Sequence, residues 1–115
     1  MSRAEASAAR LAGAAPLFAA LGDENRLRLV ARLSNEGPLP MVRLAEGAGI
    51  SRQAIAKHLA ALAEAGLVKD TRQGRERIFE LEPRRLELAR GHLDRISAAW
   101  DAAIGRLKAL VEEGE

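Results

Sequence analysis

The chain has 115 residues, of which 48% are hydrophobic, 30% charged and only 3% aromatic, and its formal net charge is +2. This length is too short for two independent cores, so we expect one domain over residues 1–115. Cysteine is absent, which excludes disulfides, thiolate metal sites and cysteine nucleophiles and fits a cytoplasmic location. With so few aromatic residues the core must be built mainly from aliphatic side chains, which favours a mainly α fold.

The first predicted element is a helix over about residues 4–21, ended by Gly22. Its apolar stretch is similar in composition to a secretory signal, but Glu5 lies in the segment that should be basic and Pro16 interrupts the apolar run. We therefore expect part of the folded domain and not a signal peptide. No run approaches the roughly 20 apolar residues that span a bilayer, so no membrane partner is expected.

A second helix is expected from Asp23, whose carboxylate can cap it, to about Ser34. The cluster of Asn, Gly and Pro over residues 35–40 ends it. Its predicted buried positions are Leu29, Val30 and Leu33, and its predicted solvated positions are Arg26 and Arg32.

Residues 41–65 have the pattern of a helix-turn-helix. A short helix is expected over about residues 41–48, followed by a turn and a second helix capped by Ser51. Ala45 is small enough to let the two helices approach closely, and Gly49 can adopt the positive φ that a tight turn requires. In this motif the second helix enters the major groove of DNA.

The helix after Ser51 has two different faces. At 100° per residue, Ile55, Leu59 and Leu62 share one face, whereas Gln53, Lys57 and Ala60 lie opposite. Glutamine can pair with adenine, lysine can reach guanine or phosphate, and small residues let a helix sink into the groove. The backbone at the helix start also favours a phosphate. The predicted DNA-contacting residues of this helix are Ser51, Arg52, Gln53, Ala56, Lys57 and His58.

The assignments of Gln53, Lys57 and His58 have alternatives. Gln53 and Lys57, taken alone, have the pattern of ordinary solvated residues, and it is the neighbouring turn and hairpin that favour DNA contact. His58 falls at the edge of the buried face, so it either contacts a phosphate or packs and hydrogen-bonds within the fold.

Residues 67–82 are predicted to form a basic β-hairpin, the wing. Its strands are expected at about 67–71 and 75–81, joined through Gln73 and Gly74. Between residues 50 and 77 there are six Lys or Arg against three acids, so positive charge gathers here. The cations that could meet a phosphate backbone are Lys69, Arg72, Arg75 and Arg77. Charged side chains also protect a hairpin edge from pairing with other chains, and both roles can hold together.

After Pro83, a favourable first residue for a helix, one long helix is expected over about residues 84–112. Apolar residues alternate at spacings of three and four, which gives heptad a and d positions and requires a partner. The first helix is too short and Ala-rich to cover this seam, so we expect a second copy of the chain to do so. Trp100 is interpreted as an interface anchor, with the lining of a ligand pocket as its alternative. The predicted seam consists of Leu86, Ala89, Leu93, Ile96, Trp100, Ala103, Leu107 and Leu110.

In their order, these segments resemble the ArsR-type winged-helix repressors. The resemblance covers about residues 16–110 and depends on ALGDENRLRL at 20–29, LA at 44–45, ISRQAIAKHL at 50–59 and AGLV at 65–68, followed by the hairpin. It implies a winged helix-turn-helix with the order α-α-α-α-β-β-α. It also implies a homodimer with both end helices, 1–21 and 84–112, at the interface, and repression by binding a palindromic operator.

The metal ligands of many ArsR-type proteins are not matched. The resemblance places a Cys-x-Cys pair at Pro40 and Val42, neither of which can bind a metal. Others use carboxylates and histidines of the last helix, but the helical neighbours of His92 include no ligand, and Asp94 and Asp101 could join only between subunits. We therefore expect a member that does not sense metal and has no cofactor, with His92 as a solvated or capping residue.

The sequence thus predicts a dimeric, cytoplasmic repressor that binds double-stranded DNA. The alternatives are a protein-interaction module that uses the winged helix, and a metal-responsive repressor with an intersubunit site. An enzyme is not expected, because no carboxylate pair, activated nucleophile or Gly-rich phosphate loop occurs in a convincing context.

Overall fold

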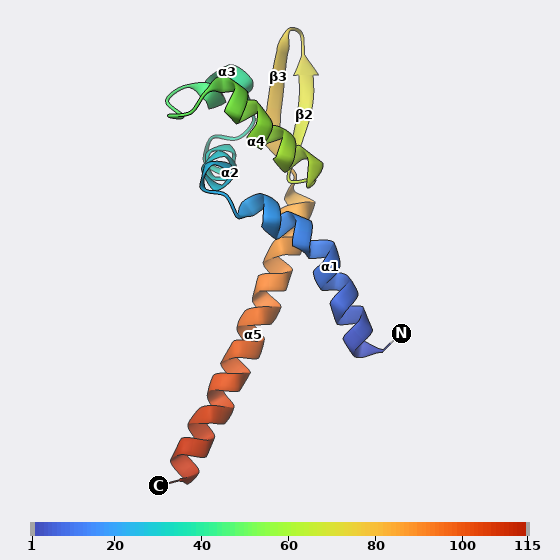
Figure 1. Ribbon diagram of the computed structural model, residues 1–115, viewed down its shortest axis with the longest axis vertical. Helices are drawn as coiled ribbons and strands as arrows, with labels where there is room; N and C mark the ends of the chain where they lie inside the picture. The colour runs from blue at the N-terminus through green and yellow to red at the C-terminus, as the bar shows by residue number, and fades with distance from the viewer. Residues whose placement is uncertain (1, 115) are drawn as a thin grey trace.

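The computed structural model describes residues 2–114, with all their side chains except those of Ser7, Ala9 and Leu11; Met1 and Glu115, the ends of the predicted domain, lie outside the described residues. The element order follows the predicted winged helix-turn-helix, with one short strand added (Figure 1). The elements are α1 (Arg3–Leu21), α2 (Glu24–Glu36), β1 (Leu39–Pro40), α3 (Met41–Ala45), α4 (Arg52–Glu64), β2 (Val68–Gln73), β3 (Glu76–Leu81) and α5 (Pro83–Glu113).

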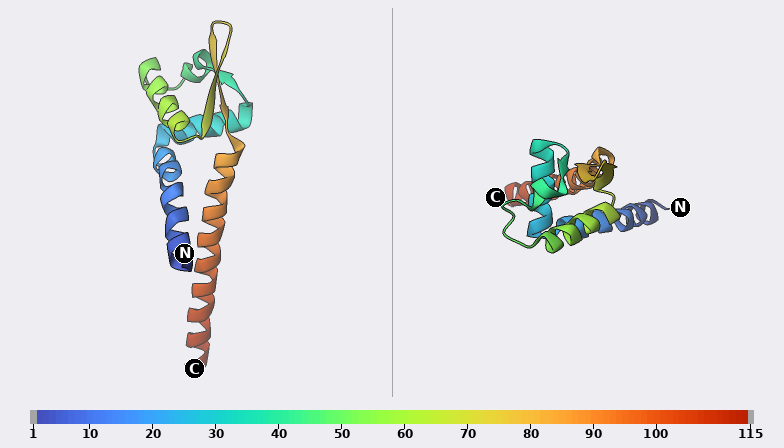
Figure 2. Two further views of the ribbon diagram at one scale, coloured as in Figure 1. Left: turned by 90° about the vertical axis from the view of Figure 1, so that its right-hand side faces the viewer. Right: turned by 90° about the horizontal axis from the view of Figure 1, so that it is seen from above.

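The molecule is elongated because α5 extends far beyond the winged-helix body. Its principal extents are 68 × 36 × 21 Å and its radius of gyration is 19.1 Å, compared with about 13 Å for a compact domain of this length. α1 contacts the first part of α5 and diverges from it toward the amino terminus (Figure 1), while α5 continues past it toward the carboxyl terminus (Figure 2). The far half of α5 is therefore exposed, without cover from residues 2–114 of the protomer.

Side-chain caps fix where the helices begin. Ser2 and Glu5 form a reciprocal capping box at α1, with Ser2 Oγ 3.1 Å from the Glu5 amide. Asp23 accepts a hydrogen bond of 3.1 Å from the Arg26 amide, and Ser51 accepts one of 3.1 Å from Ala54. Both predicted caps, Asp23 and Ser51, are confirmed.

The core cluster among the described residues is aliphatic around the ring of Phe79. Leucine and isoleucine side chains from all parts of the winged helix meet there, including Leu17 of α1. The fully buried side chains are Leu17, Leu44, Ile55, Leu59, Leu62, Leu67 and Phe79. Burial of each large aliphatic side chain contributes roughly 1.5 to 3 kcal/mol, so this core holds α4 firmly against α2 and the sheet.

The sheet has three strands, in the order β1-β3-β2, where the sequence predicted only two. β1 was missed because Pro40 breaks regular structure, but proline is tolerated in an edge strand, where its missing amide is not needed. Leu39 and Pro40 pair with Phe79 and Ile78. Gln73 pairs with Glu76, so Gly74 and Arg75 form the connection, one residue later than predicted.

The predicted end of α3 is also wrong, because the helix stops at Ala45 and not near Ala48. Glu46 adopts an extended conformation, and Gly47 and Gly49 both have positive φ, 65° and 75°. L-residues with a side chain rarely adopt such angles. The turn thus begins three residues earlier than predicted and uses two glycines.

His92, expected to be solvated or capping, is instead buried between α1 and α5. It is only 7% exposed, and its ring meets that of Phe18 edge to face, with centroids 6.5 Å apart. The prediction failed because the neighbours of His92 were sought only along its own helix, whereas the covering ring comes from α1.

Candidate DNA interface

The exposed face of α4 carries the predicted reading residues. Arg52, Gln53 and Lys57 are exposed and Ala56 is half-buried, while Ile55, Leu59 and Leu62 on the other side are buried. The division into two faces is therefore confirmed. Within residues 2–114 neither Arg52 nor Lys57 takes part in an ion pair or side-chain hydrogen bond, so both can accept a partner from outside the chain.

Arg32 of α2 secures the turn that precedes α4. Its guanidinium donates to the backbone carbonyls of Leu44 and Glu46, at 3.4 and 3.5 Å, and pairs with Glu36 at 2.8 Å. The sequence assigned Arg32 to solvent, which is wrong, because the two carbonyls that it binds lie on a different helix and in a loop. This link fixes the turn relative to α2 and thereby supports the start of α4.

The wing projects away from the body as a free hairpin (Figure 1). In β2 only Val68 is buried. Arg72 and Arg75 are exposed and, within the described part of the chain, their side chains have no ion pair or hydrogen bond. The wing thus presents unpaired positive charge close to its tip.

The other two wing cations are paired within the chain. Lys69 Nζ lies 3.8 Å from a carboxylate oxygen of Glu82. Arg77 Nε lies 3.3 and 3.2 Å from the two carboxylate oxygens of Asp70, and its guanidinium lies over the Phe79 ring at 5.4 Å. The hydrogen bonds with Asp70 raise the pKa of Arg77. The charges of Lys69 and Arg77 are therefore balanced by carboxylates of the chain, whereas those of Arg72 and Arg75 are not balanced by any described residue.

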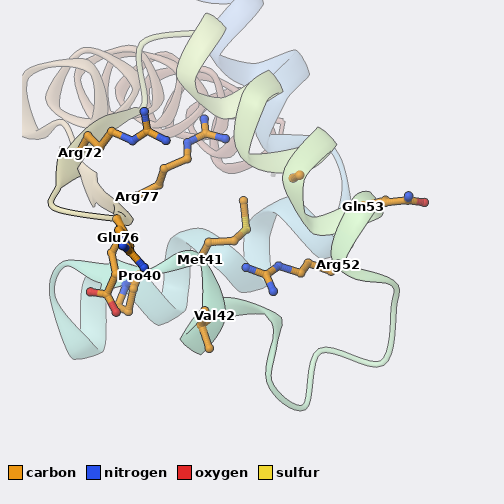
Figure 3. A pocket seen from close by; sticks show the side chains of 10 residues that line it. Pro40, Met41, Val42, Arg52, Gln53, Arg72, Glu76 and Arg77 are labelled. Atoms are coloured by element: carbon orange, nitrogen blue, oxygen red, sulfur yellow. The ribbon is translucent and has the colours of Figure 1, made fainter.

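A groove of about 620 Å³ lies between the wing, α3 and the start of α4; we call it the wing groove. Figure 3 shows Arg72 and Arg77 side by side with their guanidinium groups directed the same way, and Arg52 extending from α4 toward Met41. Gln53 extends away from the wing. The lining residues are Pro40, Met41, Val42, Arg52, Gln53, Ala56, Arg72, Arg75, Glu76 and Arg77. Of its four arginines, Arg52, Arg72 and Arg75 are not paired within residues 2–114, so the groove has a surplus of positive charge over its one acid, Glu76.

His58 lies on the side of α4 that faces α2. Its side chain is 19% exposed, and its Nδ1 lies 3.4 Å from Arg26 Nη1 and 3.9 Å from Asp23 Oδ1. This position agrees with the alternative in which His58 packs and hydrogen-bonds within the fold; contact with a phosphate stays a prediction. Arg26, expected to be solvated, is instead half-buried at this junction.

The long helix exposes a row of apolar side chains. Leu86 packs against the protomer's own core and Ala89 is buried, so the face left for a partner begins farther along than the predicted seam. Trp100 is 65% exposed. The exposed large apolar side chains beyond residue 90 are Leu93, Ile96, Trp100, Ile104, Leu107, Leu110 and Val111.

The described residues form neither a metal site nor a membrane-spanning helix. Within residues 2–114, no three His, Asp or Glu side chains gather in a way that could hold a metal ion. None of the described helices is long and apolar enough to cross a membrane.

Comparison with known proteins agrees with this architecture. A family model described as a helix-turn-helix domain matches residues 21–71. The HTH-type transcriptional regulator Rv2034 of Mycobacterium tuberculosis is 37% identical over 97 residues, which cover 84% of this chain and 87% of that protein.

Solved structures give the same result. An ArsR-like transcriptional regulator from Rhodococcus sp. RHA1 is 37% identical with a TM-score of 0.72, over 87% of this chain and 93% of that chain. The homodimeric winged helix-turn-helix DNA-binding domain of Mb0332 from Mycobacterium bovis shares the fold, with 23% identity and a TM-score of 0.60 over 86% of this chain and 87% of that chain. Rv2034 and the Rhodococcus protein are named transcriptional regulators and not enzymes. The chain belongs to the ArsR family of winged helix-turn-helix transcriptional regulators, which bind DNA.

Proposed function

We propose that this protein is a repressor that binds a palindromic DNA operator as a homodimer, with α4 in the major groove and the wing on the flanking phosphate backbone. The observation that carries the proposal is the arrangement around the wing groove. Unpaired cations of α4 and of the wing, Arg52, Arg72 and Arg75, line one groove, and a phosphate backbone is the polyanion that such a surface fits.

The reading residues would be those on the exposed face of α4. Gln53 can form two hydrogen bonds with adenine, and Lys57 can reach guanine or a phosphate. Ser51 accepts the capping hydrogen bond from Ala54, which leaves its O–H free to donate to a phosphate beside the backbone amides at the helix start. Ala56 leaves room for the helix to approach the base edges.

A second copy of the chain is the proposed cover for the exposed face of α5. Leu93, Trp100 and Leu107 recur at intervals of seven, which places them on one side of the helix. All three are more than half exposed in the protomer, and an identical helix offers the matching apolar surface by twofold symmetry. The homodimeric Mb0332 domain, which has the same fold, is consistent with this arrangement.

The signal that controls the repressor is proposed not to be a metal held at α3. The first residues of that segment are Pro40, Met41 and Val42, and neither Pro40 nor Val42 offers a ligand atom in its side chain. We place the protein in the cytoplasm, where its DNA would be.

Duplex binding measured against salt tests the proposal. If the dimer makes about 6 to 10 phosphate contacts, affinity for a labelled duplex should fall about a thousandfold or more between 50 and 200 mM salt. Fluorescence anisotropy with a duplex selected from a random library would measure this fall. Weak binding with little salt dependence would contradict the proposal and favour a protein-interaction module.

A further inference from the structure

The carboxyl end of α1, the start of α2 and the middle of α4 meet at Arg26. Its Nε donates to the Ala20 carbonyl at 2.6 Å and its Nη2 to the Ala19 carbonyl at 3.5 Å. The last carbonyls of a helix have no partner within that helix, and α1 has no basic residue in its own last turn. Arg26 therefore supplies from α2 the positive group that α1 lacks.

The remaining terminal nitrogen of the same guanidinium faces α4. Arg26 Nη1 lies 3.4 Å from His58 Nδ1. Because a guanidinium can only donate, Nδ1 is the acceptor in this hydrogen bond. Asp23 Oδ1 is 3.9 Å from the same Nδ1, too far for a hydrogen bond, and caps α2 instead.

This contact differs in kind from the packing around it. The side chains that hold α4 in the core, such as Ile55, Leu59 and Leu62, are aliphatic, and aliphatic contacts are not directional. Hydrogen bonds require set angles as well as distances. The link from α1 through Arg26 to His58 can therefore fix the angle of α4 in a way that the aliphatic core alone does not.

We propose that Arg26 is a positioning residue for DNA recognition, which acts through His58 to set the orientation of α4 relative to α1. The inference rests on the proposed function. A helix that reads base edges must lie at one angle in the major groove, whereas contacts with phosphates tolerate small rotations. Loss of the link should therefore reduce binding to the preferred duplex much more than binding to a duplex of unrelated sequence.

The test compares two duplexes, one selected from a random library with the wild-type protein and one with the same base composition in scrambled order. For Arg26→Gln we expect affinity for the selected duplex to fall about tenfold, while affinity for the scrambled duplex stays within about twofold. His58→Ala should have the same effect, and the double variant should be no worse than either single one, because both changes break the same link.

Two control variants separate positioning from stability. Arg28→Gln removes an exposed arginine of the same helix, paired only with Glu24, and should change neither affinity. Arg26→Lys keeps a positive charge beside α1 but cannot reach all three partners at once. It should therefore be more thermally stable than Arg26→Gln, yet should lack the wild-type preference for the selected duplex.

The possible outcomes distinguish this inference from the proposed function. Equal loss of affinity for both duplexes by Arg26→Gln, or an unchanged preference in the folded variant, would overturn the positioning role alone. A fall in both affinities and in the salt dependence only for His58→Ala would mean that His58 contacts a phosphate instead. Failure of the wild-type protein to bind any duplex would overturn the proposed function, and with it this inference.

Discussion

Arg77 and Asp70 pair across the wing hairpin, with Arg77 Nε within 3.3 Å of both carboxylate oxygens of Asp70. Arg77 lies directly opposite Arg72 in the strand register, and like charges in such positions repel each other. The carboxylate of Asp70 neutralises the charge of Arg77. The pair leaves Arg72 as the free cation on this part of the wing.

This division of charge predicts different salt dependences for the wing variants. Arg72→Ala and Arg75→Ala should each remove two phosphate contacts from a dimer, so the slope of log affinity against log salt should become shallower by about 1.8. Arg77→Ala should change the slope less than Arg72→Ala does, because Arg77 is held by Asp70 and is not free to contact a phosphate. Anisotropy titrations between about 50 and 200 mM salt would measure the slopes. An equal effect of Arg72→Ala and Arg77→Ala would contradict this division.

Lys57→Ala should weaken binding to a selected duplex by about tenfold, since a base or phosphate contact contributes roughly 1–3 kcal/mol. The variant should remain dimeric, because Lys57 is exposed on α4 and far from α5 in the chain. Arg106→Ala is the matched control, since it also removes one exposed positive charge but lies on α5. Unchanged affinity of Lys57→Ala would remove this residue from the reading face.

Asp23 should make stability depend on pH in the acid range. The hydrogen bond from the Arg26 amide lowers the pKa of Asp23. A folded-state pKa below the unfolded value means that the ionised carboxylate stabilises the fold above the unfolded pKa, and that this contribution is lost as pH falls through the folded pKa.

The variant Asp23→Asn keeps a side-chain oxygen for the cap but has no charge to lose. The difference in unfolding free energy between the wild type and this variant should be constant between about pH 5 and pH 7 and should shrink below about pH 4. Urea unfolding at each pH would measure it. A difference in unfolding free energy that grows as the pH falls would contradict this prediction.

Trp100→Ala should raise the dissociation constant of the proposed dimer about thirtyfold or more, because aromatic anchors at interfaces contribute about 2 kcal/mol or more. Arg95→Ala is the control, since it lies about 140° away around the same helix. Sedimentation velocity over a range of protein concentrations would compare the two. Identical dissociation constants would exclude Trp100 as an anchor.

Local signals predicted much of the fold. The caps Asp23 and Ser51 and the opposite faces of α4 depend on residues close together in the sequence, so periodicity and capping chemistry were sufficient. The carbonyls that Arg26 and Arg32 bind and the ring that covers His92 lie on other helices or in a distant turn, and no local pattern identifies them. The pairing of Arg77 with Asp70 depends on the strand register. The sequence predicted the turn at Gln73 and Gly74, one residue before its position at Gly74 and Arg75, and so gave a different register.

What covers the apolar seam of α5 is likewise not determined by its local sequence. Its heptad pattern predicted an apolar seam, but the pattern is the same whether a helix of the same protomer or a second copy covers it. Leu86 and Ala89 are covered by the protomer itself, and the face exposed to a partner begins beyond them. Where that change occurs depends on how the winged-helix core and α1 pack against the first part of α5.

Sedimentation equilibrium of the protein with one selected duplex tests the central claim most directly, because it counts protomers on the DNA. We expect two protomers on each duplex, with their recognition helices about 34 Å apart in successive major grooves. A saturated complex that contains a single protomer would contradict the dimeric arrangement on which the proposed function depends.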